Sequence, residues 1–233
     1  MSIIKRDKSI EIACDVSLDK FEKLVQETTD IEAVGAYKIG FYLGLGWSLP
    51  EVVKVARQYT DKPLIYDHQK ASTDIPETGK KFAEICKSSG IDAVILLPQS
   101  GPETEKSWIK ACQDESLQVI VGGLMTHKNY VASQGGFITD EAVPRIYEIA
   151  ADLGVKEFVV PGNKPEEIRK IKNILEKKGI NEPIFHSPGL VAQGGKITEA
   201  AQAAGKYWHA IVGRGIYESQ DFKKATLEYA SQL

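Results

Sequence analysis

Eight short runs of apolar or β-branched residues recur along the chain, and longer amphipathic segments separate them. This alternation limits the possible folds more than any other feature of the sequence. Several runs, such as Ala93–Leu97, are apolar at every position, which is typical of a parallel strand buried on both faces. We therefore expect parallel strands at Ile10–Asp15, Ala36–Gly40, Pro63–Gln69, Ala93–Leu97, Leu117–Gly123, Glu157–Gly162, Pro183–Gly189 and His209–Arg214.

The intervening segments carry apolar residues at helical spacing, and several end near a glycine, as at Gly90, Gly154 and Gly179. Eight strand–helix units in 233 residues match a (β/α)8 barrel better than an open doubly wound sheet, which usually has fewer strands. Because no linker, charge block or low-complexity tract breaks the alternation, residues 1–233 are expected to form one domain. The sequence thus predicts an α/β fold, a single-domain TIM barrel with parallel strands, whose helices include Val16–Thr29, Leu49–Gln58, Pro76–Ser88, Glu141–Asp152, Pro165–Lys178 and Phe222–Ser231.

The charge balance favours a small-molecule enzyme. With 29 basic and 32 acidic side chains, the net charge of -3 provides no electrostatic footprint for nucleic acid or an acidic membrane. The three cysteines are far apart and form no CxxC pair, so neither a disulfide framework nor a structural zinc site is indicated. Charged residues occupy positions 5–8, and no apolar run approaches the roughly 18 residues of a membrane span. We expect a cytoplasmic protein with no nucleic-acid or membrane partner.

Polar residues are concentrated where the expected strands end, which is where TIM barrels place catalytic side chains. The densest cluster extends from Asp67 to Pro76 and holds an acid, a lysine and a second acid within eight positions. A lysine between carboxylates stays protonated and can deliver a proton. The alternative is a solvated loop in which Asp74 only caps a helix. The candidate residues at or just after the strand ends, all polar except Pro188, are Asp15, Lys38, Asp67, Lys70, Asp74, Thr126, His127, Ser187, Pro188, Gln193 and Arg214.

Two glycine-rich loops, Ser187–Gly195 and Val212–Gly215, follow the last two expected strands. Loops at these barrel positions commonly bind phosphate, because glycine lets backbone N–H groups approach the oxygens. Arg214 adds a bidentate donor. The alternative is a pair of tight turns with a surface arginine, but two such loops together favour phosphate binding. The four histidines show no HxxxH or HxH spacing, so no metal site is predicted.

Taken together, five stretches resemble orotidine 5'-phosphate decarboxylase, particularly its shorter archaeal-type forms. The similarity extends along nearly the whole chain. Singly, none of the stretches is specific. They are Asp15, Tyr37–Gly40, Asp67–Pro76, Ser187–Gly195 and Val212–Tyr217.

This resemblance implies decarboxylation of orotidine 5'-phosphate to uridine 5'-phosphate in de novo pyrimidine biosynthesis, without cofactor or metal. Lys38, Asp67, Lys70 and Asp74 would form the family's alternating charged array, and Lys70 would protonate C6. Asp74 would reach into the neighbouring subunit's site, which implies a homodimer. Asp15 would bind the ribose, Thr126 would contact the pyrimidine, and a loop set would hold the phosphate. The implied substrate-binding residues are Asp15, Lys38, Asp74, Ile75, Thr126, Pro188, Gln193, Gly194, Gly213 and Arg214.

The charged cluster departs from the usual Asp-x-Lys-x-x-Asp spacing of the family. Two residues separate Asp67 from Lys70, and three separate Lys70 from Asp74. Side chains three positions apart do not share a strand face, so the array requires a bulge or an early end to the strand. Thr126 also stands where serine is common, which keeps a hydroxyl group.

Two other functions remain open. Magnesium-dependent sugar-phosphate enzymes of the same superfamily, such as 3-keto-gulonate-phosphate decarboxylase and hexulose-phosphate synthase, also use an Asp/Lys/Asp cluster on strand three. The ending Asp74-Ile75-Pro76 and the lack of an obvious extra carboxylate ligand favour the orotidine nucleotide. The third possibility is a nucleotide-binding barrel that has lost catalysis.

Overall fold

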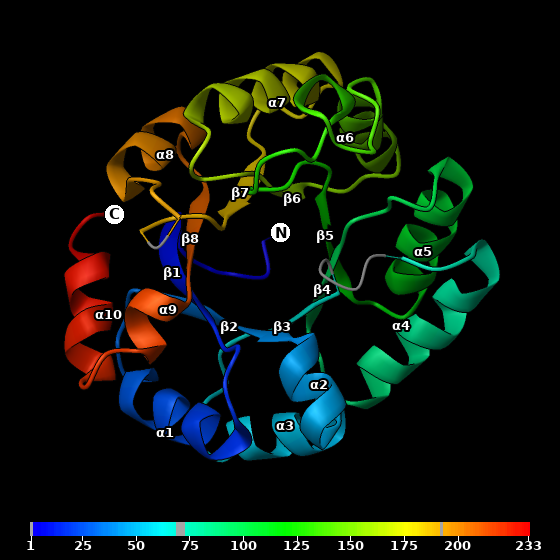
Figure 1. Cartoon of the computed structure of the whole chain (residues 1–233). Helices are drawn as coiled ribbons and strands as arrows, with labels where there is room; N and C mark the ends of the chain where they lie inside the picture. Colours follow the sequence, from blue (N-terminus) through cyan, green and yellow to red (C-terminus); the bar gives the residue numbers. More distant parts are fainter. Residues whose placement is uncertain (1, 69–72, 192) are drawn as a thin grey trace.

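The structure is a computed structural model that describes residues 2–68, 73–191 and 193–233. Its eight strands pair in parallel and in sequence order, and the last strand pairs with the first (Figure 1). This closed sheet confirms the predicted (β/α)8 barrel. The strands are β1 (Lys8–Ala13), β2 (Val34–Gly40), β3 (Leu64–Asp67), β4 (Ala93–Leu96), β5 (Gln118–Gly122), β6 (Glu157–Val159), β7 (Ile184–Ser187) and β8 (Trp208–Val212).

Helices surround the barrel on its outer side (Figure 1). Among the described residues, no helix combines the length and the apolar character needed to cross a bilayer. The helices are α1 (Leu18–Thr28), α2 (Phe41–Trp47), α3 (Leu49–Ala56), α4 (Gly79–Ser88), α5 (Pro102–Asp114), α6 (Ala142–Asp152), α7 (Pro165–Lys177), α8 (Ile197–Ala204), α9 (Arg214–Tyr217) and α10 (Phe222–Ala230), with 3-10 turns η2 (Pro76–Thr78) and η3 (Ala132–Gln134).

Two local features differ from the sequence expectation. Helix α2 was not among the expected helices, because Gly44 and Gly46 lower the helix propensity of its sequence. Arg214, expected at the end of a strand, instead begins α9. At the other end of that strand, β8 begins one residue early, at the fully buried Trp208.

Alternation along the strands creates two apolar regions. The larger lies between the sheet and the helices, and the smaller fills the barrel interior with Ala36, Ile65, Ala93, Ile95, Ile120 and Val159. Ile4 belongs to the inner region, so the N-terminal segment closes one end of the barrel, and Figure 1 shows this terminus near the barrel axis. Gly35 makes room for this segment, because a Cβ there would lie 2.7 Å from Ile4 Cγ2.

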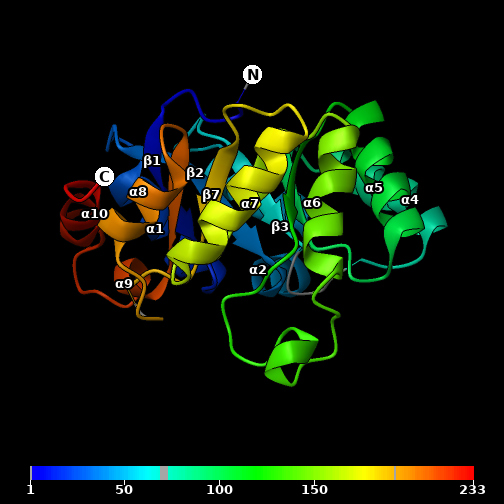
Figure 2. The same ribbon diagram turned by 90° about the horizontal axis from the view of Figure 1, so that it is seen from above.

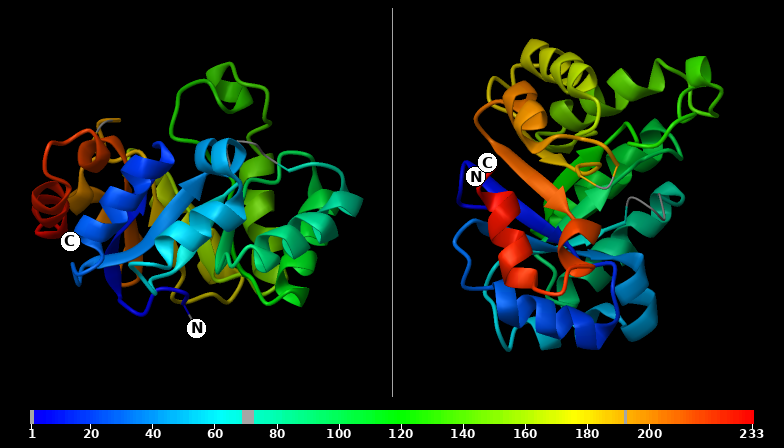
Figure 3. Two further views of the ribbon diagram at one scale, coloured as in Figure 1. Left: turned by 90° about the horizontal axis from the view of Figure 1, so that it is seen from below. Right: turned by 60° about the vertical axis from the view of Figure 1, so that its left-hand side comes forward.

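The opposite end of the barrel carries the longest connections. The connection between β5 and α6, which includes η3, stands clear of the barrel on the side away from the N-terminus (Figure 2). Figure 3 shows the same relation from the other side. The carboxyl ends of the strands therefore open at the face that bears this connection.

Glu11, Glu157 and His186 form a fully buried cluster of ionisable side chains inside the barrel. His186 Nδ1 lies 2.8 Å from Glu11 Oε2, and His186 Nε2 lies 3.0 Å from Glu157 Oε2. An imidazole that donates to a carboxylate through each nitrogen carries both protons. Burial alone would lower the pKa of His186, but the hydrogen bonds and charges of Glu11 and Glu157 raise it to about 9. His186 is therefore an imidazolium at neutral pH.

This buried cation makes the stability of the fold depend on pH. The folded protein binds the His186 proton more tightly than the unfolded chain does, so the stabilisation is complete below the ordinary pKa of 6.5 and is lost as the pH rises through 9. We expect the wild-type Tm to fall between pH 7 and pH 9.5. His186→Gln should lower the Tm at pH 7 by roughly 10 °C, because it leaves two buried carboxylates without their cation. It should not show the alkaline decline; parallel Tm curves for the two proteins would contradict a charged His186.

Candidate active site

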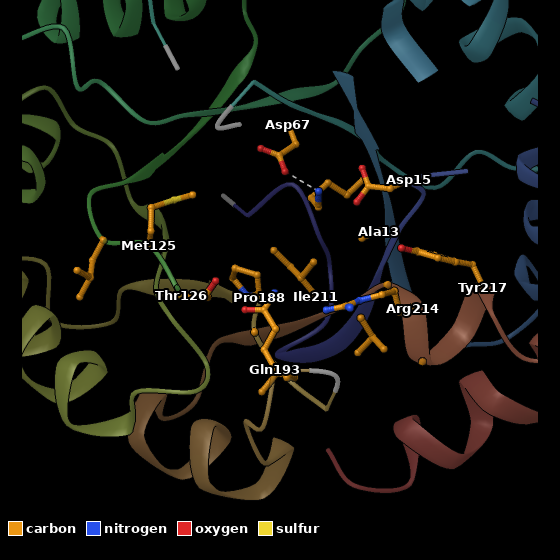
Figure 4. Close-up of a pocket in the computed structure, with 17 residues that line it drawn as sticks. Ala13, Asp15, Asp67, Met125, Thr126, Pro188, Gln193, Ile211, Arg214 and Tyr217 are labelled. Atoms are coloured by element: carbon orange, nitrogen blue, oxygen red, sulfur yellow. Dashed lines mark hydrogen bonds and ion pairs between the residues drawn. The ribbon is translucent and has the colours of Figure 1, made fainter. Parts of the chain in front are cut away.

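A pocket opens at the carboxyl ends of the strands and gathers most of the predicted site residues (Figure 4). Lys38 comes from β2, Asp67 from β3, and Asp15 from the segment after β1. The remaining walls come from the connections after β5, β7 and β8. The lining residues are Ala13, Asp15, Lys38, Asp67, Leu124, Met125, Thr126, Pro188, Gly189, Leu190, Gln193, Ile211, Val212, Gly213, Arg214, Gly215 and Tyr217.

Lys38 and Asp67 form a buried ion pair at the floor of the pocket. Lys38 Nζ donates to Asp67 Oδ2 at 2.5 Å, and the two residues are 3% and 4% exposed. Burial alone would lower the pKa of Lys38, but the carboxylates of Asp67 and Asp15 outweigh it and hold that pKa above its ordinary value. The pocket therefore has a fixed cation between carboxylates.

The end of β3 accounts for the unusual spacing of the charged cluster. Asp67 pairs with Gly40 and is the last residue of β3, whereas the apolar run extended to Gln69. The strand thus ends early, which is one of the two arrangements, a bulge or an early strand end, that the spacing required. Lys70 itself lies outside the described residues.

The opposite side of the pocket has the composition of an anion site. Gln193 and Arg214 lie across the pocket from Asp67 in Figure 4, and the Gly213 backbone lies beside Arg214. Leu190 and Gly195 form an isolated bridge that folds the glycine-rich loop back on itself. Guanidinium, amide and backbone N–H groups are the donors that phosphate oxygens accept. Gly194, also predicted here, does not line the pocket.

Two residues after β6 hold the wall formed by Met125 and Thr126 in place, and neither was singled out from the sequence. Asn163 Nδ2 donates to Thr126 O at 3.1 Å, and Lys164 Nζ donates to Met125 O at 2.9 Å. Asn163 also lies against the other loop, because a Cβ at Gly189 would be 3.2 Å from Asn163 Oδ1. Their position directly after the sixth apolar run was the available signal, since polar residues at the ends of other runs were singled out for that reason.

Some predicted residues lie elsewhere. Asp74 and Ile75 are exposed and do not line this pocket. The Ile75 carbonyl accepts a hydrogen bond from Trp108 Nε1 at 3.0 Å, which fixes this end of the charged segment to α5. Ser187 accepts a hydrogen bond from Trp208 Nε1 at 2.8 Å and does not line the pocket.

Within residues 2–68, 73–191 and 193–233, no three His, Cys, Asp or Glu side chains are arranged to hold a metal ion. Asp67 is instead paired with Lys38.

Residues 8–229 match the orotidine 5'-phosphate decarboxylase / HUMPS family. The chain belongs to this family. Curated relatives named orotidine 5'-phosphate decarboxylase include that of Methanosarcina mazei, which is 30% identical over 230 residues, 99% of this chain and 97% of that protein. The protein of the same name from Methanocaldococcus jannaschii is 30% identical over 223 residues, 95% of this chain and 97% of its own length.

A solved structure of a family member superimposes on the whole barrel. The crystal structure of the Methanocaldococcus jannaschii decarboxylase, complexed with inhibitor BMP, has a TM-score of 0.83 and 29% identity. The match covers 97% of this chain and 98% of that one. Family membership confirms the resemblance that the sequence analysis drew from five stretches of the chain.

The contact between the two pocket loops can be tested at Gly189. Its φ of 88° and the φ of 84° at Gly194 make alanine unfavourable at both positions, by roughly 1–2 kcal/mol each. A Cβ at Gly189 would also lie 2.7 Å from Thr126 Cγ2, whereas at Gly194 no described atom lies within 4 Å. We expect Gly189→Ala to lower the free energy of unfolding by about 1–3 kcal/mol more than Gly194→Ala. Urea unfolding measures both, and equal losses would contradict the contact.

Proposed function

We propose that the protein is a cytoplasmic enzyme that decarboxylates orotidine 5'-phosphate to uridine 5'-phosphate in de novo pyrimidine biosynthesis, without a cofactor. One observation supports this most strongly. A single pocket has the buried Lys38–Asp67 pair on one side and the donors of Gln193, Gly213 and Arg214 on the other. A nucleotide with a carboxylated base and a phosphate requires charged groups at the base and anion-binding donors at the phosphate, and this pocket has both.

In this proposal the phosphate is held by Gln193, Gly213 and Arg214, with Gly194 and Pro188 in the adjoining loop. Asp15 and Lys38 hydrogen-bond the ribose hydroxyls, because a carboxylate accepts and an ammonium donates. Thr126 contacts the pyrimidine from the wall that Asn163 fastens. The base then lies over the Lys38–Asp67 pair.

The reaction breaks the bond between C6 and the carboxylate carbon. Carbon dioxide leaves, and the electron pair stays on C6 as a vinyl carbanion that the ring stabilises poorly. Lys70 stabilises this charge and gives its proton to C6. Asp67 lies near the departing carboxylate and disfavours the bound substrate relative to the transition state.

Repulsion by Asp67 supplies only part of the required acceleration. Two like charges about 4 Å apart repel by about 4 kcal/mol at an effective dielectric constant of about 20. Large enzymatic accelerations require barrier reductions of up to roughly 23 kcal/mol. We assign the rest of the barrier reduction to stabilisation of the negative charge by Lys70 and to binding energy at the phosphate. That binding energy draws the Gln193 loop over the site.

The active unit is proposed to be a homodimer in which Asp74 and Ile75 complete the partner's site. Both residues are exposed and lie outside the pocket of their own chain, although Asp74 belongs to the charged array by its sequence context. Leu45 on α2 is 82% exposed and Phe137 is fully exposed. A second copy that covers these side chains would remove apolar surface from water.

Turnover is tested by the ultraviolet absorbance of orotidine 5'-phosphate in the presence of EDTA. We expect the substrate band to disappear as uridine 5'-phosphate forms. Lys70→Ala should lower kcat by at least roughly 10³-fold while nucleotide binding persists. Arg214→Ala should weaken binding, raising KM by roughly 10- to 100-fold through loss of charge-assisted hydrogen bonds to the phosphate, and should also slow catalysis by an amount that added phosphite partly restores.

Other results of this assay would identify the competing functions. Binding of uridine 5'-phosphate without turnover would indicate a barrel that has lost catalysis. Absence of both, with activity on a sugar phosphate when magnesium is added, would indicate the other branch of the superfamily. Normal turnover in Lys70→Ala would refute its assignment as the proton donor.

Mixing two inactive variants tests whether Asp74 acts across the interface. Lys70→Ala and Asp74→Ala should each be nearly inactive alone. After random exchange, half of the dimers are mixed, and one of their two sites has both Lys70 and the partner's Asp74. We therefore expect the mixture to recover about a quarter of wild-type activity. No recovery, with subunit exchange verified by mass spectrometry of tagged chains, would show that Asp74 serves its own chain.

A further inference from the structure

Charged side chains of alternating sign continue from the active site into the barrel interior. Asp67 pairs with Lys38 at the pocket floor, and Glu11 pairs with His186 deeper in the barrel. Glu157 pairs with the other ring nitrogen of His186, Nε2. All five residues are buried, and Glu11, His186 and Glu157 are 0% exposed. Burying five ionisable side chains costs desolvation free energy, and each charge must be compensated by another. Packing alone therefore does not explain the set.

The two carboxylates that hold His186 are not equivalent. Both oxygens of Glu157 are used, because Oε1 accepts a hydrogen bond from the Ile3 backbone N–H at 3.0 Å. Glu11 uses only Oε2 for His186, and its buried Oε1 accepts no hydrogen bond from the described residues. Glu11 therefore has an oxygen available for a second partner.

Lys38 is the second cation in the field of Glu11. Ala13, two positions after Glu11 on the same face of β1, pairs with Lys38 on β2. Asp67 and Asp15 contribute more to the raised pKa of Lys38, and Glu11 adds to it in the same direction. Asp67 and Asp15 line the pocket, where substrate would engage them, whereas Glu11 does not. The charge of Glu11 thus stays constant while the groups above it change partners.

We propose that Glu11 is a positioning residue, which supplies a fixed negative charge beneath Lys38 and keeps that ammonium group protonated and in place, given the role proposed above for Lys38. His186 acts through Glu11 by holding its carboxylate in place through the hydrogen bond to Oε2. Three groups face His186: Glu11 from β1, Glu157 from β6 and the His209 ring from β8, 4.9 Å away. His209 stays neutral, because burial and the charge of His186 lower its pKa.

Glu157→Gln is the matched control for Glu11→Gln. Each variant removes one carboxylate from His186 at a fully buried position, so both should lose comparable stability. Only Glu11→Gln changes the charge that faces Lys38. We expect Glu11→Gln to lower kcat/KM by about 10-fold at pH 7, and Glu157→Gln to stay within about 3-fold at temperatures where both are folded. Equal losses in the two variants, or no loss in Glu11→Gln, would overturn the proposal.

A conservative pair covers the case in which the glutamine variants fail to fold. Glu11→Asp and Glu157→Asp keep the charge and shorten each side chain by one methylene group. Because the charge beneath Lys38 persists, Glu11→Asp should keep kcat/KM within about 3-fold of wild type and leave its pH profile unchanged. A loss as large as that expected of Glu11→Gln would show that shape, not charge, matters at this position.

A measurement without turnover separates this inference from the proposed reaction. Lysines labelled with 13C at Cε report their own protonation by NMR, and Lys38→Met assigns the Lys38 signal. We expect Lys38 to begin losing its proton at lower pH in Glu11→Gln than in wild type or Glu157→Gln. The same titration in both glutamine variants would overturn the role of Glu11. A difference in titration in a protein that does not decarboxylate orotidine 5'-phosphate would contradict the proposed function alone.

Discussion

A closed barrel of eight parallel strands sends every second side chain into an interior that water does not fill. At the level of Ile65 and Ile120 this interior is apolar and packs on Ile4 of the N-terminal segment. Every ionisable group that shares the space must be compensated by another, because an unpaired buried charge costs far more than a hydrogen bond supplies. The alternation of positive and negative side chains inside the barrel follows from this constraint.

The same constraint produces a pocket with two chemically different sides. Lys38 and Asp67 project from strands, so their positions are fixed by sheet register, and their ion pair needs no loop to hold it. The opposite side is made of the connections after β7 and β8, and its donors are two side chains and the backbone between them. Asn163 connects the wall at Thr126 to the loop after β7, since it bonds the Thr126 carbonyl and lies against Gly189.

The strands could be predicted from sequence because a strand that is buried on both faces has apolar residues at every position, as at Ala93–Leu97. Their polar ends then located Asp15, Lys38, Asp67 and Thr126, which the structure brings together. Helix α2 could not be predicted, because its stability comes from packing of Leu43 and not from its own propensity.

The buried ion set was beyond sequence reasoning for a different reason. Glu11, Glu157 and His186 are 29 to 175 positions apart, and their strands meet only because the barrel closes. Each residue alone carries no motif. The register of β1 on β8, which aligns Glu11 with Ile211, is a tertiary property of the same kind. Asn163 differs from these, because its place after a strand was visible in the sequence.

Replacement of a buried ion set by well-packed apolar residues is often neutral or stabilising, so stability alone gives no reason for a barrel to keep one. The upper end of this set supplies the reason, since Lys38 must hold its proton among groups that exchange partners with a substrate. A cation in a water-poor space needs a compensating anion that the substrate does not reach. Glu11 meets that need and is held in place by His186, and Glu157 in turn pairs with His186 and accepts a hydrogen bond from the Ile3 N–H. The charge requirement of the active site thereby extends to the closed end of the barrel.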